Sequence, residues 1–307
     1  MGIVDEPRIV QSENFEILSL ATETVPPYTT TNTILYGKNN FWVIDPATKD
    51  PHHQEFLIRH IQMRLNKKQK MLGILLSHHH SDHIGAVSLL SSNFKSPILA
   101  HKFLCGKVDF SVDRTVEEGE HLALDEKNSL EVIYTPGHAE SHVVFFDRSD
   151  GCLIAGDMIT SRGTILIPPN SGSLKLYLFH LERIASLPIK TIIPAHGEAI
   201  VEQPHFFLLN AIKHRLERIE QIYRVLENSQ QLIDASDITN TIYQRKIEDR
   251  LMFFAQLSVE SGLYWLKENN LALQENYRWK LSMHTYTSKE KILLNPLKEI
   301  NERLRYT

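Results

Sequence analysis

The chain has 307 residues, a net charge of −4 at neutral pH, 42% hydrophobic residues and 23% charged residues. This size favours one large domain, or a large domain with a smaller one, and the composition is typical of a soluble globular protein. No run of 18 apolar residues exists and residues 1–7 lack the apolar core of a secretory signal, so neither a transmembrane helix nor export is expected. The two cysteines, Cys105 and Cys152, form no close pair, and we therefore expect a reducing, cytoplasmic environment.

The first hundred residues alternate between strand-like and helix-like segments. Their pattern predicts strands at 31–37, 41–45, 71–76 and 97–100, a helix at 52–65 and a short helix at 83–90. Asp82 is expected near the N-cap of the short helix. Strands that alternate with helices are typical of sheets covered by helices, so the fold class is α/β.

A second strand-rich block follows. It predicts strands at 130–134, 142–146 and 152–155, a helix at 174–186 and a short strand at 191–193. Turns with Pro, Gly or Asp at 135–137 and 149–151 separate the strands. The same kind of layered sheet is therefore expected to continue to about residue 200.

The composition changes near Pro204. The pattern then predicts a long amphipathic helix at 206–228, helices at 237–244 and 247–268, a hairpin over 271–281 and a charged helical tail over 289–305. Helices followed by a small hairpin outline a winged helix. We therefore expect one domain over residues 1–204, and a long connecting helix with a winged-helix-like domain over residues 205–307.

The charge is distributed unevenly between these two parts. Residues 1–204 contain 18 Lys and Arg against 24 Asp and Glu, whereas residues 205–307 contain 15 against 13. The asymmetry permits nucleic-acid contact through the C-terminal part, but it does not argue strongly for such contact.

The most informative segment is Ser77–His83, which follows the predicted strand at 71–76. It contains four candidate metal ligands within six residues: His78, His80, Asp82 and His83. Imidazoles and a carboxylate that converge at a strand end are what a transition-metal site needs.

Three more candidate ligands lie beside Gly or Pro, just past other apolar segments. They are His138 in a Thr-Pro-Gly-His turn, Asp157 in Ala-Gly-Asp and His196 in Pro-Ala-His-Gly. Residues that follow neighbouring strands in this way can meet at one edge of a sheet.

Together these residues resemble the metallo-β-lactamase-fold superfamily. Residues 78–83 read His-x-His-x-Asp-His, and the three later residues follow in the family's order. The resemblance covers about the first two hundred residues and implies an αββα sandwich. It also implies a two-metal site, in which His78, His80 and His138 hold one ion, Asp82, His83 and His196 hold the other, and Asp157 bridges them. Five His and two Asp suit two Zn²⁺ ions, with iron or manganese as alternatives.

Such a site implies a metal-dependent hydrolase whose nucleophile is a hydroxide that bridges the metals. Asp82 is expected to orient this nucleophile and to accept its proton while it ligates the second metal. No Ser or Cys nucleophile is required.

Other residues near the motif have supporting or structural roles in this interpretation. His79 is expected to point away from the metals, and Asp45 resembles the family's first acidic motif and is expected to support a ligand. His142 either contacts the site or is a structural histidine, and Tyr177 either lines the pocket or packs in the core. The helical histidines are interpreted as surface or packing residues: His52, His53 and His60.

Two features resemble the branch of β-lactamase-like protein 2. They are the loop from Gly156 to Pro169 with the helix after it, and the long helix around residues 213–222. Relatives in that branch include a zinc endoribonuclease acting on single-stranded RNA, and they have a winged-helix-like C-terminal domain. This sequence departs from the pattern at Ser77, where Thr is more usual, and at Ala86, where a second Gly is usual. Residues 171–173 also lack an acidic residue that is often found there.

Two substrate classes therefore remain open. One is single-stranded RNA, cleaved by a phosphodiesterase. The other is a small thioester or ester, as for glyoxalase II. A non-catalytic scaffold is disfavoured because all seven expected ligands are intact.

Overall fold

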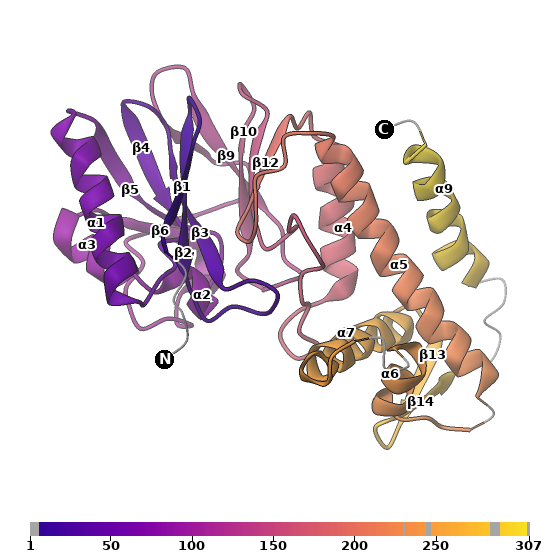
Figure 1. Ribbon diagram of the computed structural model, residues 1–307. Coiled ribbons are helices and arrows are strands. Elements are labelled where there is room, and N and C mark those ends of the chain that lie inside the picture. The colour runs from indigo at the N-terminus through magenta and orange to yellow at the C-terminus, as the bar shows by residue number, and fades with distance from the viewer. Residues whose placement is uncertain (1–5, 230, 244–246, 283–288, 306–307) are drawn as a thin grey trace. The chain divides into compact units, whose positions relative to one another are not determined.

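The computed structural model describes residues 6–229, 231–243, 247–282 and 289–305 (Figure 1). Two compact units make up the chain. The first, here called the sheet unit, comprises residues 1–135, 139–163 and 188–204, and the second, the helical unit, comprises residues 136–138, 164–187 and 205–307. The segments at 136–138 and 164–187 lie within residues 1–204 of the sequence but group with residues 205–307. Residues 1–5 and 244, on which parts of the sequence predictions rest, lie outside the described residues.

The sheet unit contains a seven-stranded sheet with strands in the order of the chain. Strands β1 to β4 are antiparallel, and β4 to β7 are parallel. The strands are β1 (Arg8–Gln11), β2 (Phe15–Ala21), β3 (Thr30–Tyr36), β4 (Asn40–Ile44), β5 (Lys70–Leu76), β6 (Ile98–His101) and β7 (Arg114–Val116).

Helices cover the outer face of this sheet because parallel strands need crossover connections. They are α1 (Pro51–Asn66), α2 (Ser81–Ile84), α3 (Val87–Phe94) and the 3₁₀ turn η1 (Lys102–Leu104). Asp50 caps α1 by accepting a hydrogen bond from the backbone N–H of His53, and Pro51 takes the first helical position. Leu57 of α1 and Leu90 of α3 belong to one buried cluster with residues of β4 and β5.

The second sheet of this unit has five strands in the order β12-β11-β10-β9-β8. They are β8 (His121–Ala123), β9 (Ser129–Tyr134), β10 (Val143–Asp147), β11 (Cys152–Gly156) and β12 (Thr191–Pro194). One apolar cluster joins residues of both sheets, among them Ile34, Leu75 and Phe145, so the core lies between the two sheets. The observed mixed α/β fold agrees with the expected class.

This core gives a testable stability prediction. Phe145→Ala should lower the free energy of unfolding by about 3–5 kcal/mol, because it removes a fully buried ring and leaves a cavity. Phe145 is only 1% exposed. Urea unfolding measures the effect, and Met63→Ala, at a position that is 53% exposed in the same unit, should change stability by about 0.5 kcal/mol or less. Equal effects of the two substitutions would contradict the assignment of Phe145 to the core.

The helical unit contains several helices and a hairpin. Its elements are α4 (Leu174–Ala185), α5 (Pro204–Asn228), α6 (Ala235–Tyr243), α7 (Asp249–Glu268), β13 (Ala272–Glu275), β14 (Arg278–Leu281), the π-helical turn η2 (Glu290–Leu294) and α9 (Asn295–Arg303). The hairpin expected over 271–281 is present, and the winged-helix arrangement stays a prediction. Within the described ranges, no helix has both the length and the apolarity needed to cross a membrane.

The prediction of a single helix at 83–90 is wrong. The chain forms two short helices there, α2 and α3, with a break at Gly85 and Ala86. The backbone N–H groups of these two residues donate to the carbonyl oxygens of Ala47 and Pro46, 3.1 and 2.8 Å away. Asp82 is consequently the second residue of α2, and His80 takes the N-cap position.

Candidate metal centre

Three strand ends bring candidate ligands of the sheet unit to the same place. β5 ends at Leu76, directly before the His-rich segment. β11 and β12 are parallel, with Gly156 opposite Pro194, so Asp157 and His196 emerge side by side. The N–H of Val143, the first residue of β10, donates to the carbonyl of Ser77 over 2.8 Å and ties the two sheets together at this edge.

Asp45 fixes the orientation of His83. Its carboxylate accepts hydrogen bonds from the backbone N–H and the hydroxyl of Ser77, at 2.7 and 2.5 Å. It also lies 2.9 Å from Nδ1 of His83. Because a carboxylate can only accept, Nδ1 carries the proton and Nε2 is left to face the neighbouring carboxylates. Asp45 thus contacts a candidate ligand, as expected.

Two carboxylates and two imidazoles converge within the sheet unit. Oδ1 of Asp157 lies 3.6 Å from Nε2 of His83 and 3.3 Å from Nε2 of His196. The carboxylate of Asp82 lies 4.0 Å from Nε2 of His83 and 3.7 Å from Nε2 of His196. The possible ligand atoms of Asp82, His83 and His196 all lie within 4.8 Å of one another, and the same holds for His78, His83 and Asp157.

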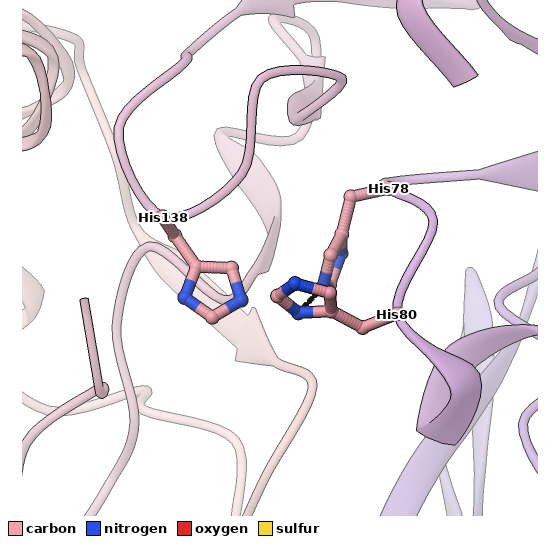
Figure 2. Close-up of side chains that lie close together, drawn as sticks. All are labelled: His78, His80 and His138. Atoms are coloured by element: carbon pink, nitrogen blue, oxygen red, sulfur yellow. Dashed lines mark hydrogen bonds between the residues drawn. The ribbon is translucent and has the colours of Figure 1, made fainter. Parts of the chain in front are cut away.

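His78 and His80 lie beside this group. Figure 2 shows the two rings and the hydrogen bond between them, which joins Nε2 of His78 and Nδ1 of His80, 3.0 Å apart. The hydroxyl of Ser77 lies 3.0 Å from Nδ1 of His78. The hydroxyl of Ser77 therefore connects the candidate ligand His78 to Asp45, which in turn contacts the candidate ligand His83.

His138 belongs to the helical unit, where a hydrogen bond fixes the orientation of its ring. Its Nδ1–H donates to the carbonyl of Leu166 over 2.8 Å, so Nε2 is left as an acceptor. The preceding residue must be glycine, because Gly137 has φ +148° and a Cβ there would meet the backbone of Tyr177 at 2.4 Å. The carbonyl of Gly137 accepts a hydrogen bond from the N–H of Ser173, the N-cap of α4, over 2.7 Å.

The residues present fit a metal ion. Nε2 of His83 is buried and has no hydrogen-bond partner among the described residues, although three carboxylates surround the ring. Burial lowers the pKa of His83, but Asp157, Asp45 and Asp82 outweigh it and raise the pKa to about 9. The pKa of His196 is also raised, because Asp157 outweighs the effect of burial. Positive charge is therefore strongly favoured here, and a divalent cation supplies it to imidazole and carboxylate ligands.

His142 and His79 have distinct positions around this centre. Nε2 of the buried His142 accepts a hydrogen bond from the backbone N–H of Asp157 at 3.0 Å, so its Nδ1–H donates to the hydroxyl of Thr135 at 2.9 Å. His142 thus supports the segment that carries Asp157. His79 contacts the hydroxyl of Ser141 at 2.7 Å and belongs to none of the candidate ligand groups in the described part of the chain.

The other histidines and Tyr177 lie within the scaffold. His53 accepts a hydrogen bond from the N–H of Ala21, and His60 contacts Glu16, so both are buried packing residues, whereas His52 is exposed. Tyr177 is buried in α4 of the helical unit.

Tyr28 is a functional candidate that the sequence prediction missed. Its ring stacks on His196 with centroids 5.7 Å apart, and its hydroxyl accepts from Thr160 Oγ1 at 2.7 Å and from the N–H of Arg162 at 2.9 Å. The hydroxyl also donates to the carbonyl of Arg162 over 2.9 Å. Tyr28 therefore joins His196 to the loop that follows Asp157. Its partners lie more than 130 residues away in sequence, and no local pattern marks it.

Removal of this hydroxyl should weaken metal binding. In Tyr28→Phe the ring stays, but three hydrogen bonds to the loop at 160–162 are lost, so we expect metal affinity to fall by about 10-fold. Competition with a chelator measures the affinity. Tyr277→Phe is the matched control because Tyr277 is 89% exposed, and it should leave the affinity unchanged. An unchanged affinity in Tyr28→Phe would show that metal binding does not depend on these three hydrogen bonds.

A cavity of about 420 Å³ borders Asp82 within the sheet unit. It is lined by Ala21, Thr22, Glu23, Ala47, Lys49, Asp50, Ser81 and Asp82. Small-molecule sites typically measure about 300–1,000 Å³, so this cavity has the size of a binding site for a small group.

Several known proteins are similar to this chain. A Caenorhabditis elegans protein named Beta-lactamase-like protein 2 homolog is 28% identical over 220 residues, which are 69% of this chain and 70% of that protein. The Hydroxyacylglutathione hydrolase of Wigglesworthia glossinidia brevipalpis is 25% identical over 278 residues, which are 89% of this chain and 94% of that protein.

Solved structures share the fold. A metallo-beta-lactamase family protein from Thermus thermophilus has a TM-score of 0.68 and 20% identity, and covers 87% of this chain and 98% of its own. A beta-lactamase domain protein from Burkholderia ambifaria has a TM-score of 0.75 and 17% identity. The match covers 89% of this chain and 93% of that protein. The family described as the Metallo-beta-lactamase superfamily matches residues 28–196. More than half of the chain is thus accounted for, and the chain belongs to the metallo-beta-lactamase superfamily.

Proposed function

We propose that the chain is a hydrolase that depends on two metal ions, most simply Zn²⁺. The observation that carries the proposal is the group of Asp82, His83, Asp157 and His196, in which two carboxylates face two imidazole Nε2 atoms. Asp82, His83 and His196 would hold one ion, and Asp157 would bridge to the other. Imidazole and carboxylate ligands suit Zn²⁺, and they also suit iron or manganese.

The second ion would be held by His78, His80 and His138. His138 lies in the helical unit, but Thr135 and Ala139, on either side of its segment, both belong to the sheet unit. The protonated Nδ1 of His138, bound to the carbonyl of Leu166, leaves Nε2 ready to bind a cation.

Each residue has a definite task in this proposal. When bound, two such ions would make hydroxide available near neutral pH and would stabilise negative charge on the substrate oxygen. Asp82, whose side chain is 16% exposed and borders the cavity, orients the attacking water and accepts its proton. Asp45 holds His83 in place, and His142 holds the backbone of Asp157.

A small thioester or ester is the substrate class that we favour. The similarity to a hydroxyacylglutathione hydrolase extends over 89% of the chain, which includes both units. The cavity beside Asp82 has the size of a small-molecule site. The net charge of residues 1–204 is negative, which does not favour a polyanionic substrate.

Single-stranded RNA is the second candidate. It is supported by the similarity to Beta-lactamase-like protein 2 homologues of Caenorhabditis elegans and Drosophila melanogaster, each 28% identical to this chain. The resemblance to that branch includes the loop after Asp157 and the long helix α5.

A parallel assay tests both classes. The metal-loaded protein is incubated with an S-lactoylglutathione-type thioester and with single-stranded RNA, each beside the Asp82→Ala variant. Thioester hydrolysis that is lost in the variant supports the favoured class, and RNA cleavage that is lost in the variant supports the alternative. RNA cleavage that persists in Asp82→Ala comes from a contaminating nuclease, and no turnover of either substrate would refute both assignments.

A further inference from the structure

Helix α5 carries a cluster of positive side chains that hydrolysis does not use. Arg215 and Arg218 are one turn apart and are here called the cation cluster, and His214 lies beside them. Arg215 is only 6% exposed, although it carries a permanent charge. A buried charge is costly unless an opposite charge or several hydrogen bonds compensate it.

Within the described residues, no carboxylate compensates the two guanidinium groups. The acidic residues next to them on α5 are committed elsewhere, since Glu217 lies 3.8 Å from Lys213 and Glu220 lies 2.7 Å from Arg224. Over the described ranges of the chain, neither Arg215 nor Arg218 has a carboxylate within ion-pair distance.

Neutral groups hold the cluster in position. Arg215 donates to the backbone carbonyl of Ile165 and lies 5.6 Å from the ring centre of Tyr177. Arg218 lies 4.4 Å from the ring centre of Tyr243, on α6. Contacts between cations and aromatic rings orient a guanidinium but do not neutralise it. In the described part of the chain, no nitrogen of either arginine is a buried side-chain atom without a hydrogen-bond partner, and Arg218 is only partly buried.

The resulting positive potential affects the neighbouring imidazole. Loss of water around the ring, together with the charges of Arg215 and Arg218, lowers the pKa of His214 to about 4. Burial also lowers the pKa of Arg215. The cluster therefore presents a concentrated, uncompensated positive charge.

We propose that the cation cluster is a binding site for an oxyanion, either a phosphate or a carboxylate group. Guanidinium groups bind both through paired, charge-assisted hydrogen bonds, and the planar fork suits these anions better than chloride. The site lies next to the segment that positions His138, because Arg215 binds the carbonyl of Ile165 and His138 binds that of Leu166. The proposal concerns the helical unit alone and does not require that the chain be a hydrolase.

NMR of the full-length, metal-loaded protein labelled at the histidine rings tests this directly. Inorganic phosphate and acetate are titrated separately, each against sodium chloride at matched ionic strength. A bound anion should shift the His214 resonance saturably and raise the pKa of His214. Tighter binding of phosphate would identify a phosphate-bearing ligand, and tighter binding of acetate would identify a carboxylate-bearing one.

Two variants on the same helix make the result specific. Arg218→Gln should weaken binding by about 10-fold, because it removes one charged donor from the site. Arg218 is partly exposed, so this variant avoids the risk of unfolding that substitution of the buried Arg215 would carry. Arg224→Gln, which removes a cation paired with Glu220, should change binding by less than about 2-fold. The proposal is overturned if neither anion shifts His214 saturably, or if Arg218→Gln binds as well as the unchanged protein.

Discussion

The Asp82→Ala variant is expected to hydrolyse its substrate about 10²–10⁴ times more slowly than the unchanged protein, because it removes the group that we propose as the acceptor of the attacking water's proton. Asp82 also belongs to a candidate ligand group with His83 and His196, so one metal ion should bind less tightly as well. The measurement is kcat at saturating substrate and saturating metal, which separates the loss of the proton acceptor from the loss of metal.

A matched control lies in the same cavity. Glu23 lines the cavity beside Asp82 but belongs to no candidate ligand group of the described residues. Glu23→Gln should therefore keep kcat within about 2-fold, in line with a residue outside the proton transfer. Full activity of Asp82→Ala at saturating metal would show that another group accepts the proton.

Asp45→Asn should affect both metal binding and stability. The carboxylate of Asp45 binds His83 and two groups of Ser77, and the side chain is 4% exposed. An asparagine places an N–H₂ group against these donors, so metal affinity should fall by about 10–100-fold. The metal-free protein should lose about 3–5 kcal/mol in the free energy of unfolding, because a buried charged network is broken.

Asp147→Asn is the control for this variant. Asp147 is also buried in the sheet unit, where it accepts hydrogen bonds from Tyr36 and Ser149, but it is not part of any ligand group within the described ranges. Asp147→Asn should lower the free energy of unfolding without changing the metal affinity. Chelator competition and urea unfolding give the two quantities, and an equal loss of metal affinity in both variants would mean that Asp45 acts only through stability.

The candidate ligands could be predicted from the sequence because each follows an apolar segment at a strand end. His83, Asp157 and His196 come after β5, β11 and β12, and the parallel register of the last two strands brings their residues together. The supporting role of Asp45, which directly follows β4, was expected from its resemblance to the first acidic motif of the superfamily.

Features that depend on distant contacts could not be predicted in this way. Tyr28 contacts residues more than 130 positions away, and α2 and α3 are separate because Gly85 and Ala86 bind the loop after β4. Strands β7 and β8 have three residues each, too few to show a period. The grouping of α4 with the C-terminal helices likewise follows from tertiary contacts.

The metal content of the purified protein tests the central claim most directly. Elemental analysis of protein purified under metal-replete conditions should find about two metal ions per chain, as expected for a two-metal hydrolase. A content of one ion per chain, or of none, would contradict the two-metal centre built from His78, His80, Asp82, His83, His138, Asp157 and His196.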